Sequence, residues 1–130
     1  MLQERMKKTV MLVDDDQSLK DRVRESLEKG GFKVLEAGNG MECLQMLRSG
    51  IKPKLIIFDA AMPVMSGWRA IYEMHKDKKL AKIKAVLFSN KESMKGMKHK
   101  AYEKELQDHY IGKPFTAKEI LKKVRQLTAS

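Results

Sequence analysis

Residues 55–59 read LIIFD, an apolar run that ends abruptly at a carboxylate. Near the start of the chain, residues 9–16 read TVMLVDDD and repeat the pattern. Short apolar runs without polar alternation are typical of strands that a parallel sheet buries on both faces. The two runs therefore predict two buried strands, over 9–13 and 55–58, each followed directly by an aspartate.

Strands and helices alternate along the rest of the chain. Three more strands are expected over 32–37, 83–88 and 109–111. Helices are expected between the strands, because apolar residues recur there at helical spacing and polar residues suited to capping precede them. These helices cover 16–30, 39–48, 66–75, 91–105 and 116–127. The alternation predicts an α/β fold, a doubly wound five-stranded parallel sheet with helices on both faces.

The helix starts carry specific capping signals. Asp16, Asn39, Ser66 and Thr116 are the expected cap residues. Glu42 and Glu119 each stand three positions after a cap, where a capping box places its acidic residue.

The composition is that of a folded, soluble domain. The chain has 130 residues, of which 42% are hydrophobic and 34% charged. No apolar run is long enough to span a membrane and residues 1–8 do not resemble a secretory signal, so a cytoplasmic location is expected. The single cysteine, Cys43, excludes an internal disulfide and a cysteine-built zinc site, and is expected in the core. Residues 9–128 are expected to form one domain after an extension over 1–8.

The charge is strongly basic and unevenly spread. Lys and Arg number 27 against 17 Asp and Glu, a net charge of +10. Residues 1–65 hold 11 basic and 10 acidic residues, whereas residues 66–130 hold 16 and 7. Such an excess indicates either a solvated lysine-rich surface or an acidic or nucleic-acid partner.

Chemically active side chains stand at the carboxyl ends of the predicted strands. They are Asp14, Asp15, Asp59, Ser89 and Lys113. In an open α/β sheet, ligands bind outside this edge. Carboxylates in one cleft repel one another unless a cation holds them, and oxygen ligands favour a hard ion such as Mg²⁺. A lysine and a hydroxyl add groups that hold phosphoryl oxygens, and an aspartate is a competent nucleophile for forming an acyl phosphate.

These segments resemble the receiver domains of two-component response regulators. The resemblance is carried by residues 13–16 (VDDD), 58–67 (FDAAMPVMSG), 88–90 (FSN) and 113–115 (KPF), and it covers nearly the whole chain. It implies a flavodoxin-like (βα)5 fold with strand order 2-1-3-4-5 and no attached effector domain. It also implies a signalling role rather than that of an enzyme, although such a domain assists its own phosphorylation and autodephosphorylation.

The resemblance further implies roles at the strand ends. Asp59 would accept a phosphoryl group from a histidine kinase or phosphotransfer protein. Asp14, Asp15, Asp59 and the backbone carbonyl of Ala61 would bind Mg²⁺.

The resemblance assigns the remaining site residues to the phosphorylated state. Ser89 would hydrogen-bond a phosphoryl oxygen, Lys113 would pair with the phosphoryl group or with Asp59, and Tyr110 would turn inward as Ser89 moves. The output face would comprise the helix over 91–105, the strand over 109–111 and the last helix. Two departures from the family pattern are Ser66, in place of an aspartate, and residues 106–108 (LQD), in place of a Gly-Ala pair.

Two other functions compete with this interpretation. Asp14-x-Asp16 with Ser18 also resembles the first motif of haloacid dehalogenase-type phosphatases, and Ser89 and Lys113 could serve as the second and third. Against this, the chain is short and no acidic pair follows Lys113. A nucleic-acid-binding module would use the basic second half, but that half lacks a recognisable motif or an aromatic stacking surface, so nucleic acid is not the expected partner. Because ten lysines against three acids fall in residues 76–104, an acidic protein on the output face is favoured about equally with plain solubility.

Overall fold

The computed structural model describes residues 7–59, 62, 64–89, 110–112 and 115–129. For Ser89 and residues 110–112 it describes only the backbone. The predicted helix over 91–105 lies outside the described residues. None of the helices in the described part has the length and apolar character needed to cross a membrane.

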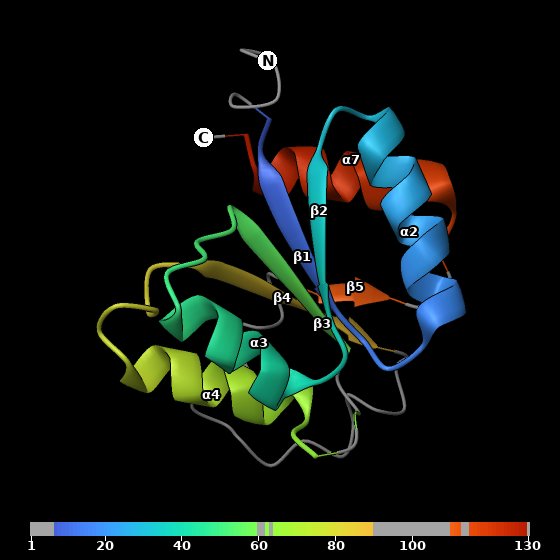
Figure 1. Ribbon diagram of the computed structural model, residues 1–130. Coiled ribbons are helices and arrows are strands. Elements are labelled where there is room, and N and C mark those ends of the chain that lie inside the picture. Colours follow the sequence, from blue (N-terminus) through green and yellow to red (C-terminus); the bar gives the residue numbers. More distant parts are fainter. Residues whose placement is uncertain (1–6, 60–61, 63, 90–109, 113–114, 130) are drawn as a thin grey trace.

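A parallel sheet of five strands forms the centre of the molecule (Figure 1). Its order is β2-β1-β3-β4-β5, which confirms the predicted fold class and strand order. The strands are β1 (Thr9–Val13), β2 (Lys33–Ala37), β3 (Leu55–Asp59), β4 (Lys84–Ser89) and β5 (Tyr110–Gly112). Both ends of β2, β3, β4 and β5 lie within one residue of their predicted positions. The carboxyl ends of the strands therefore lie where the sequence predicted them.

Helices cover both faces of the sheet (Figure 1). Helices α2 (Gln17–Lys29) and α7 (Ala117–Leu127) pack together on one face, and α3 (Gly40–Arg48) and α4 (Gly67–Lys76) pack together on the other. The two cores follow the alternation of the central strand: Val10 and Leu12 face the α2–α7 layer, whereas Met11 and Val13 face the α3–α4 layer. All four side chains are buried, which explains the continuous apolar runs.

All four predicted caps are present. Asp16, Asn39, Ser66 and Thr116 each accept a hydrogen bond from a backbone N–H in the first turn of their helix. Thr116 and Glu119 form the predicted capping box. Glu42 differs, because its carboxylate accepts a hydrogen bond from the backbone N–H of Gly38 (2.9 Å), one residue before the cap. The caps determine the residues at which α2, α3, α4 and α7 begin after the preceding strands.

Two lysines at the amino-terminal edge of the sheet hold the carboxyl end of α7. Lys8, just before β1, donates from Nζ to the carbonyl oxygen of Thr128. Lys84, the first residue of β4, donates from Nζ to the carbonyl oxygen of Leu127 (2.9 Å). Cations are favourable at a helix carboxyl end, where carbonyl groups lack partners within the helix. The last helix is therefore anchored at the amino-terminal edge of the sheet.

Cys43 lies in the core, as predicted, with 0% of its surface exposed. Burial, with a smaller contribution from the charge of Glu42, raises the pKa of its thiol from 9.0 to about 12. The thiol therefore stays protonated at neutral pH, and the reactive thiolate is suppressed.

We expect Cys43 to react with a disulfide reagent at pH 8 only as the protein opens. Labelling of the native protein should be orders of magnitude slower than labelling in denaturant, and the native rate should rise with added denaturant. The absorbance of the released thiol measures both rates. Rapid, stoichiometric labelling of the native protein would contradict the burial of this residue.

Candidate functional site

Three aspartates meet where β1 and β3 end. Val13 pairs with Phe58 across the two strands, so the next residues, Asp14 and Asp59, stand at the same level of the sheet. Asp15 follows Asp14 at this edge. Carboxylate oxygens of Asp14, Asp15 and Asp59 lie within 4.8 Å of one another. The structure thus brings together the three carboxylates that the sequence placed at strand ends.

This acidic cluster has the donor set of a magnesium site. Asp14 is 3% exposed, Asp59 is half-buried and Asp15 is exposed, so the cluster opens to solvent on one side. Three carboxylates this close repel one another, and burial of Asp14 removes water that would screen the repulsion. Hard cations with oxygen ligands relieve such repulsion, and Mg²⁺ needs only a few carboxylates because it keeps bound waters. The three aspartates therefore fit the ion that the sequence predicted.

The turn after β1 holds Asp14 in place. Its backbone N–H donates to the carbonyl oxygen of Ala37 (3.2 Å), which continues the pairing with β2. Its carboxylate Oδ1 accepts from the backbone N–H of Asp16 (2.9 Å). Asp16 in turn accepts from the backbone N–H of Leu19 (3.0 Å) and caps α2, as predicted. One short turn therefore positions the Asp14 carboxylate and starts α2.

Close backbone packing positions Asp59. A Cβ on Gly67 would lie 2.2 Å from the carbonyl oxygen of Asp59 and 2.9 Å from the Cβ of Phe58. Only glycine lets the first turn of α4 approach the end of β3 this closely. On the other side, the backbone N–H of Gly40 donates to the carbonyl oxygen of Met65 (3.3 Å), which ties the loop after Asp59 to α3.

Val64 in this loop is strained. Its φ is 67°, in the left-handed region that β-branched residues rarely adopt, and 81% of its surface is exposed. The exposed side chain offers little burial to offset this conformation, so the surrounding loop must impose it.

Replacing Val64 with asparagine should stabilise the protein by about 1 kcal/mol, because asparagine tolerates the left-handed conformation. The free energy of unfolding in urea measures the effect. Val64→Ile, which keeps the β-branch, is the matched control and should leave stability nearly unchanged. An asparagine variant no more stable than the wild type would show that Val64 is not strained.

The remaining predicted site residues are only partly described. The backbone of Ser89 ends β4, one position beyond Phe88, which pairs with Asp59. The backbone of Tyr110 begins β5 opposite Leu87. Ala61 and Lys113 lie outside the described residues, although Lys113 directly follows Gly112 at the end of β5. The roles assigned to these four residues stay predictions.

Glu36 is a structural residue that the sequence did not single out. Its carboxylate accepts hydrogen bonds from Gln17 Nε2 (2.9 Å) and Arg24 Nε (2.6 Å), and it pairs with Lys20 Nζ at 3.9 Å. The Lys20 side chain is only 8% exposed, so its charge needs this partner. The sequence signal for this role was an acidic residue inside a strand whose other residues after Lys33 are apolar. Glu36 fixes α2, and hence the turn carrying Asp14 and Asp15, to the edge strand.

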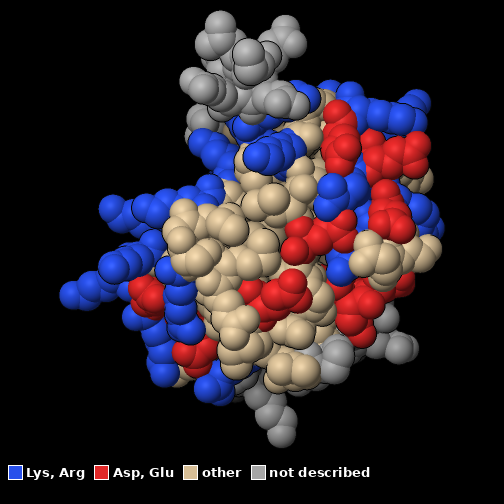
Figure 2. All heavy atoms as spheres, in the orientation of Figure 1, with Lys and Arg blue, Asp and Glu red and all other residues tan. Residues whose placement is uncertain are grey.

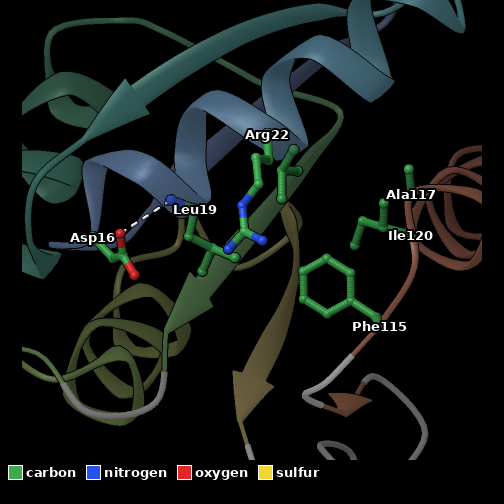
Figure 3. A pocket seen from close by; sticks show the side chains of 7 residues that line it. Asp16, Leu19, Arg22, Phe115, Ala117 and Ile120 are labelled. Atoms are coloured by element: carbon green, nitrogen blue, oxygen red, sulfur yellow. Dashed lines mark hydrogen bonds between the residues drawn. The ribbon is translucent and has the colours of Figure 1, made fainter.

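A pocket of about 390 Å³ opens beside the cluster, between α2 and the start of α7 (Figure 3). It is lined by Asp16, Leu19, Arg22, Val23, Phe115, Ala117 and Ile120. Figure 3 shows Leu19 and Arg22 of α2 side by side, with Phe115 across the pocket from them. The Phe115 ring stacks on Phe88 with centroids 4.4 Å apart. The pocket combines an apolar floor with an arginine, and sequence alone did not reveal it.

Known protein families and structures agree with this geometry. A family model described as "Response regulator receiver domain" matches residues 10–125. The chain belongs to the response regulator receiver family. Receiver domains are signalling modules rather than metabolic enzymes, and this membership argues against the phosphatase alternative.

Relatives and solved structures place the domain in context. The chain is 34% identical over 126 residues to the "Probable transcriptional regulator ycf29" of Porphyra purpurea, covering 94% of this chain and 57% of that protein. It is 27% identical over 124 residues to the alkaline phosphatase synthesis transcriptional regulatory protein PhoP of Bacillus subtilis, covering 94% and 49%. It thus spans about half the length of these curated relatives. The crystal structure of a CheY-like receiver domain protein from Methanospirillum hungatei matches with a TM-score of 0.76 and 27% identity over 94% of each chain.

Proposed function

We propose that this receiver domain is a phosphorylation switch in which Asp59 accepts a phosphoryl group from a histidine kinase or phosphotransfer protein. The observation that carries the proposal is the acidic cluster of Asp14, Asp15 and Asp59, within 4.8 Å at the carboxyl edge of the sheet. Of the three, Asp59 is half-buried and ends a strand whose neighbour pairing fixes its backbone. It has both the exposure and the rigidity expected of a nucleophile.

The phosphoryl group would pass directly from the donor histidine to Asp59, with no other covalent intermediate. A carboxylate oxygen of Asp59 attacks the phosphorus of a phosphohistidine, a P–O bond forms, and the P–N bond breaks with its electron pair returning to the imidazole nitrogen. Mg²⁺ bound by Asp14, Asp15 and Asp59, with the Ala61 carbonyl, would neutralise charge on the phosphoryl oxygens. Attack of water on the same phosphorus would later break the P–O bond to Asp59, release inorganic phosphate and restore the carboxylate. This autodephosphorylation resets the switch.

Ser89, Lys113 and Tyr110 complete the proposed switch. Ser89 ends β4, the strand next to β3, and Lys113 comes directly after Gly112, the last residue of β5, in the sequence. We assign Ser89 to a hydrogen bond with a phosphoryl oxygen, Lys113 to charge pairing, and Tyr110 to the response. The resulting change would reach a downstream protein through β5, α7 and the segment 91–105. Relatives named as transcriptional regulators are consistent with a signalling output.

Incubation with acetyl phosphate or phosphoramidate and Mg²⁺ should raise the intact mass of the protein by one phosphoryl group. Asp59→Asn should abolish the modification, because the nucleophilic oxygen is lost, and a chelator should suppress it. The matched control is Asp16→Asn, which retains a cap for α2 and should be modified normally. An unmodified wild type, or equal modification of Asp59→Asn, would overturn the proposal.

The pocket between α2 and α7 is proposed as part of the docking surface for the phosphodonor protein. A donor must approach the edge carrying Asp59, and Leu19 and Arg22 line the pocket together with Asp16, the residue after Asp15 of the acidic cluster. We expect Leu19→Ala with Arg22→Ala to slow transfer from a phosphorylated donor protein roughly tenfold or more, because apolar and arginine contacts dominate interfaces. Modification by acetyl phosphate should be unchanged. Equal slowing with both donors would place the defect in the chemical site instead.

A further inference from the structure

Lysines line the amino-terminal edge of the sheet, at the opposite end from the acidic cluster. Lys33 opens β2, Lys8 precedes β1, Lys54 precedes β3 and Lys84 opens β4. The strand order β2-β1-β3-β4 makes these four lysines consecutive neighbours in space. We call them the lysine row. Because adjacent strands lie about 4.8 Å apart, the row spans roughly 14 Å of backbone.

The strand register confirms that the row is continuous. Lys33 is paired with Thr9, the residue after Lys8. The backbone N–H of Lys54 donates to the carbonyl oxygen of Thr9 (2.8 Å), and Lys84 is paired with Leu55, the residue after Lys54. Lys33 and Lys54 are therefore level with Thr9, with Lys8 one residue before this level and Lys84 one residue after it. Because successive residues of a strand point to opposite faces, Lys8 and Lys84 lie toward one face of the sheet, and Lys33 and Lys54 lie toward the other. All four are exposed, although Lys8 and Lys84 also reach the end of α7.

The loops that lead into β3 and β4 add to this charge. Residues 48–58 and 76–88 together hold one arginine and seven lysines but only one acid, Asp77. Asp77 is itself paired with Arg48 at 3.9 Å. These two segments thus carry a net charge of +7 out of the +10 of the whole chain. Figure 2 shows the lysine and arginine atoms gathered at the left, over the loops before β3 and β4.

The chemistry of this edge favours a nucleic acid over a protein partner. Protein interfaces draw their affinity from buried aromatic, apolar and arginine anchors. Among the described residues, the large apolar side chains that are exposed are Met41 and Val64, and both lie toward the carboxyl edge, in the first turn of α3 and the loop after β3. Lysines without such anchors suit contacts with phosphates, which need only positive charge.

We propose that the lysine row and the adjoining loop lysines Lys52, Lys78, Lys79 and Lys82 bind the phosphate backbone of nucleic acid without reading its sequence. The net charge of these segments suits a polyanion, and binding of phosphates offsets the repulsion among like charges at this edge. The surface lies at the other end of the strands from Asp59, so nucleic acid and a phosphodonor occupy opposite ends of the domain. The proposal does not rest on phosphorylation at Asp59.

The test is fluorescence anisotropy with a labelled DNA duplex of about 20 base pairs and arbitrary sequence, titrated at several salt concentrations from about 50 mM upward. The row variant replaces Lys33, Lys54, Lys79 and Lys82 with glutamine and leaves Lys8 and Lys84 to hold α7. The matched control replaces Arg22, Arg69, Lys118 and Lys122 with glutamine, which removes the same charge from the helices. Circular dichroism and thermal melts check that both variants fold.

We expect the wild type to bind with an affinity that falls steeply with salt. The row variant should bind at least about tenfold more weakly at low salt and show a slope of log K against log salt that is shallower by roughly two to four, whereas the control should lose much less. Equal losses of DNA affinity in the row variant and the control would show that only the net charge of the protein matters. That result would overturn the assignment of binding to the lysine row. Binding of polyglutamate as tight as that of DNA, with the same sensitivity to the row substitutions, would identify an acidic protein as the partner instead. An absence of binding by the wild type at low salt would also overturn the proposal.

Discussion

Electrostatic repulsion among Asp14, Asp15 and Asp59 is the constraint on which the rest of the structure depends. The sheet holds three carboxylates within 4.8 Å, and Asp14 is almost wholly buried. Such an arrangement is unfavourable without a cation, so the surrounding fold must supply the free energy that maintains it. The buried central strands, the close contact at Gly67 and the cap at Asp16 provide that support. Their combined effect is a pre-formed anionic site at one end of a rigid sheet.

Charge is segregated along the strands, and this follows from a parallel topology. Every strand enters the sheet at the same edge and leaves at the other, so residues just before and just after strands collect at opposite ends. Here the entering residues include Lys8, Lys33, Lys54 and Lys84, and the leaving residues include Asp14 and Asp59. The lysines also stabilise the carboxyl end of α7, which lies at the entering edge. One topology thus separates an acidic cluster from a basic edge.

Much of this was predictable because it depends on local signals. Apolar runs that stop at Asp14 and Asp59 marked the strand ends, and Asp16, Asn39, Ser66 and Thr116 marked the helix starts. Features that depend on contacts between distant residues were not predictable. Glu42 reaches Gly38 rather than its expected partner, Glu36 gathers three partners from α2, and the lysine row exists only once the strand order and register are known. The left-handed Val64 is likewise imposed by its loop and not by its residue type.

The stability of the protein as a function of Mg²⁺ concentration tests the central claim most directly. If the three carboxylates repel one another and share a cation, Mg²⁺ should stabilise the wild type progressively as the site fills. Asp15→Asn should raise stability in the absence of divalent ions, because it removes one charge, and should lose most of the gain from Mg²⁺. Asp21→Asn, on the exposed face of α2, should respond to Mg²⁺ as the wild type does. A wild type indifferent to Mg²⁺, or an Asp15→Asn variant with an unaltered response, would contradict the account.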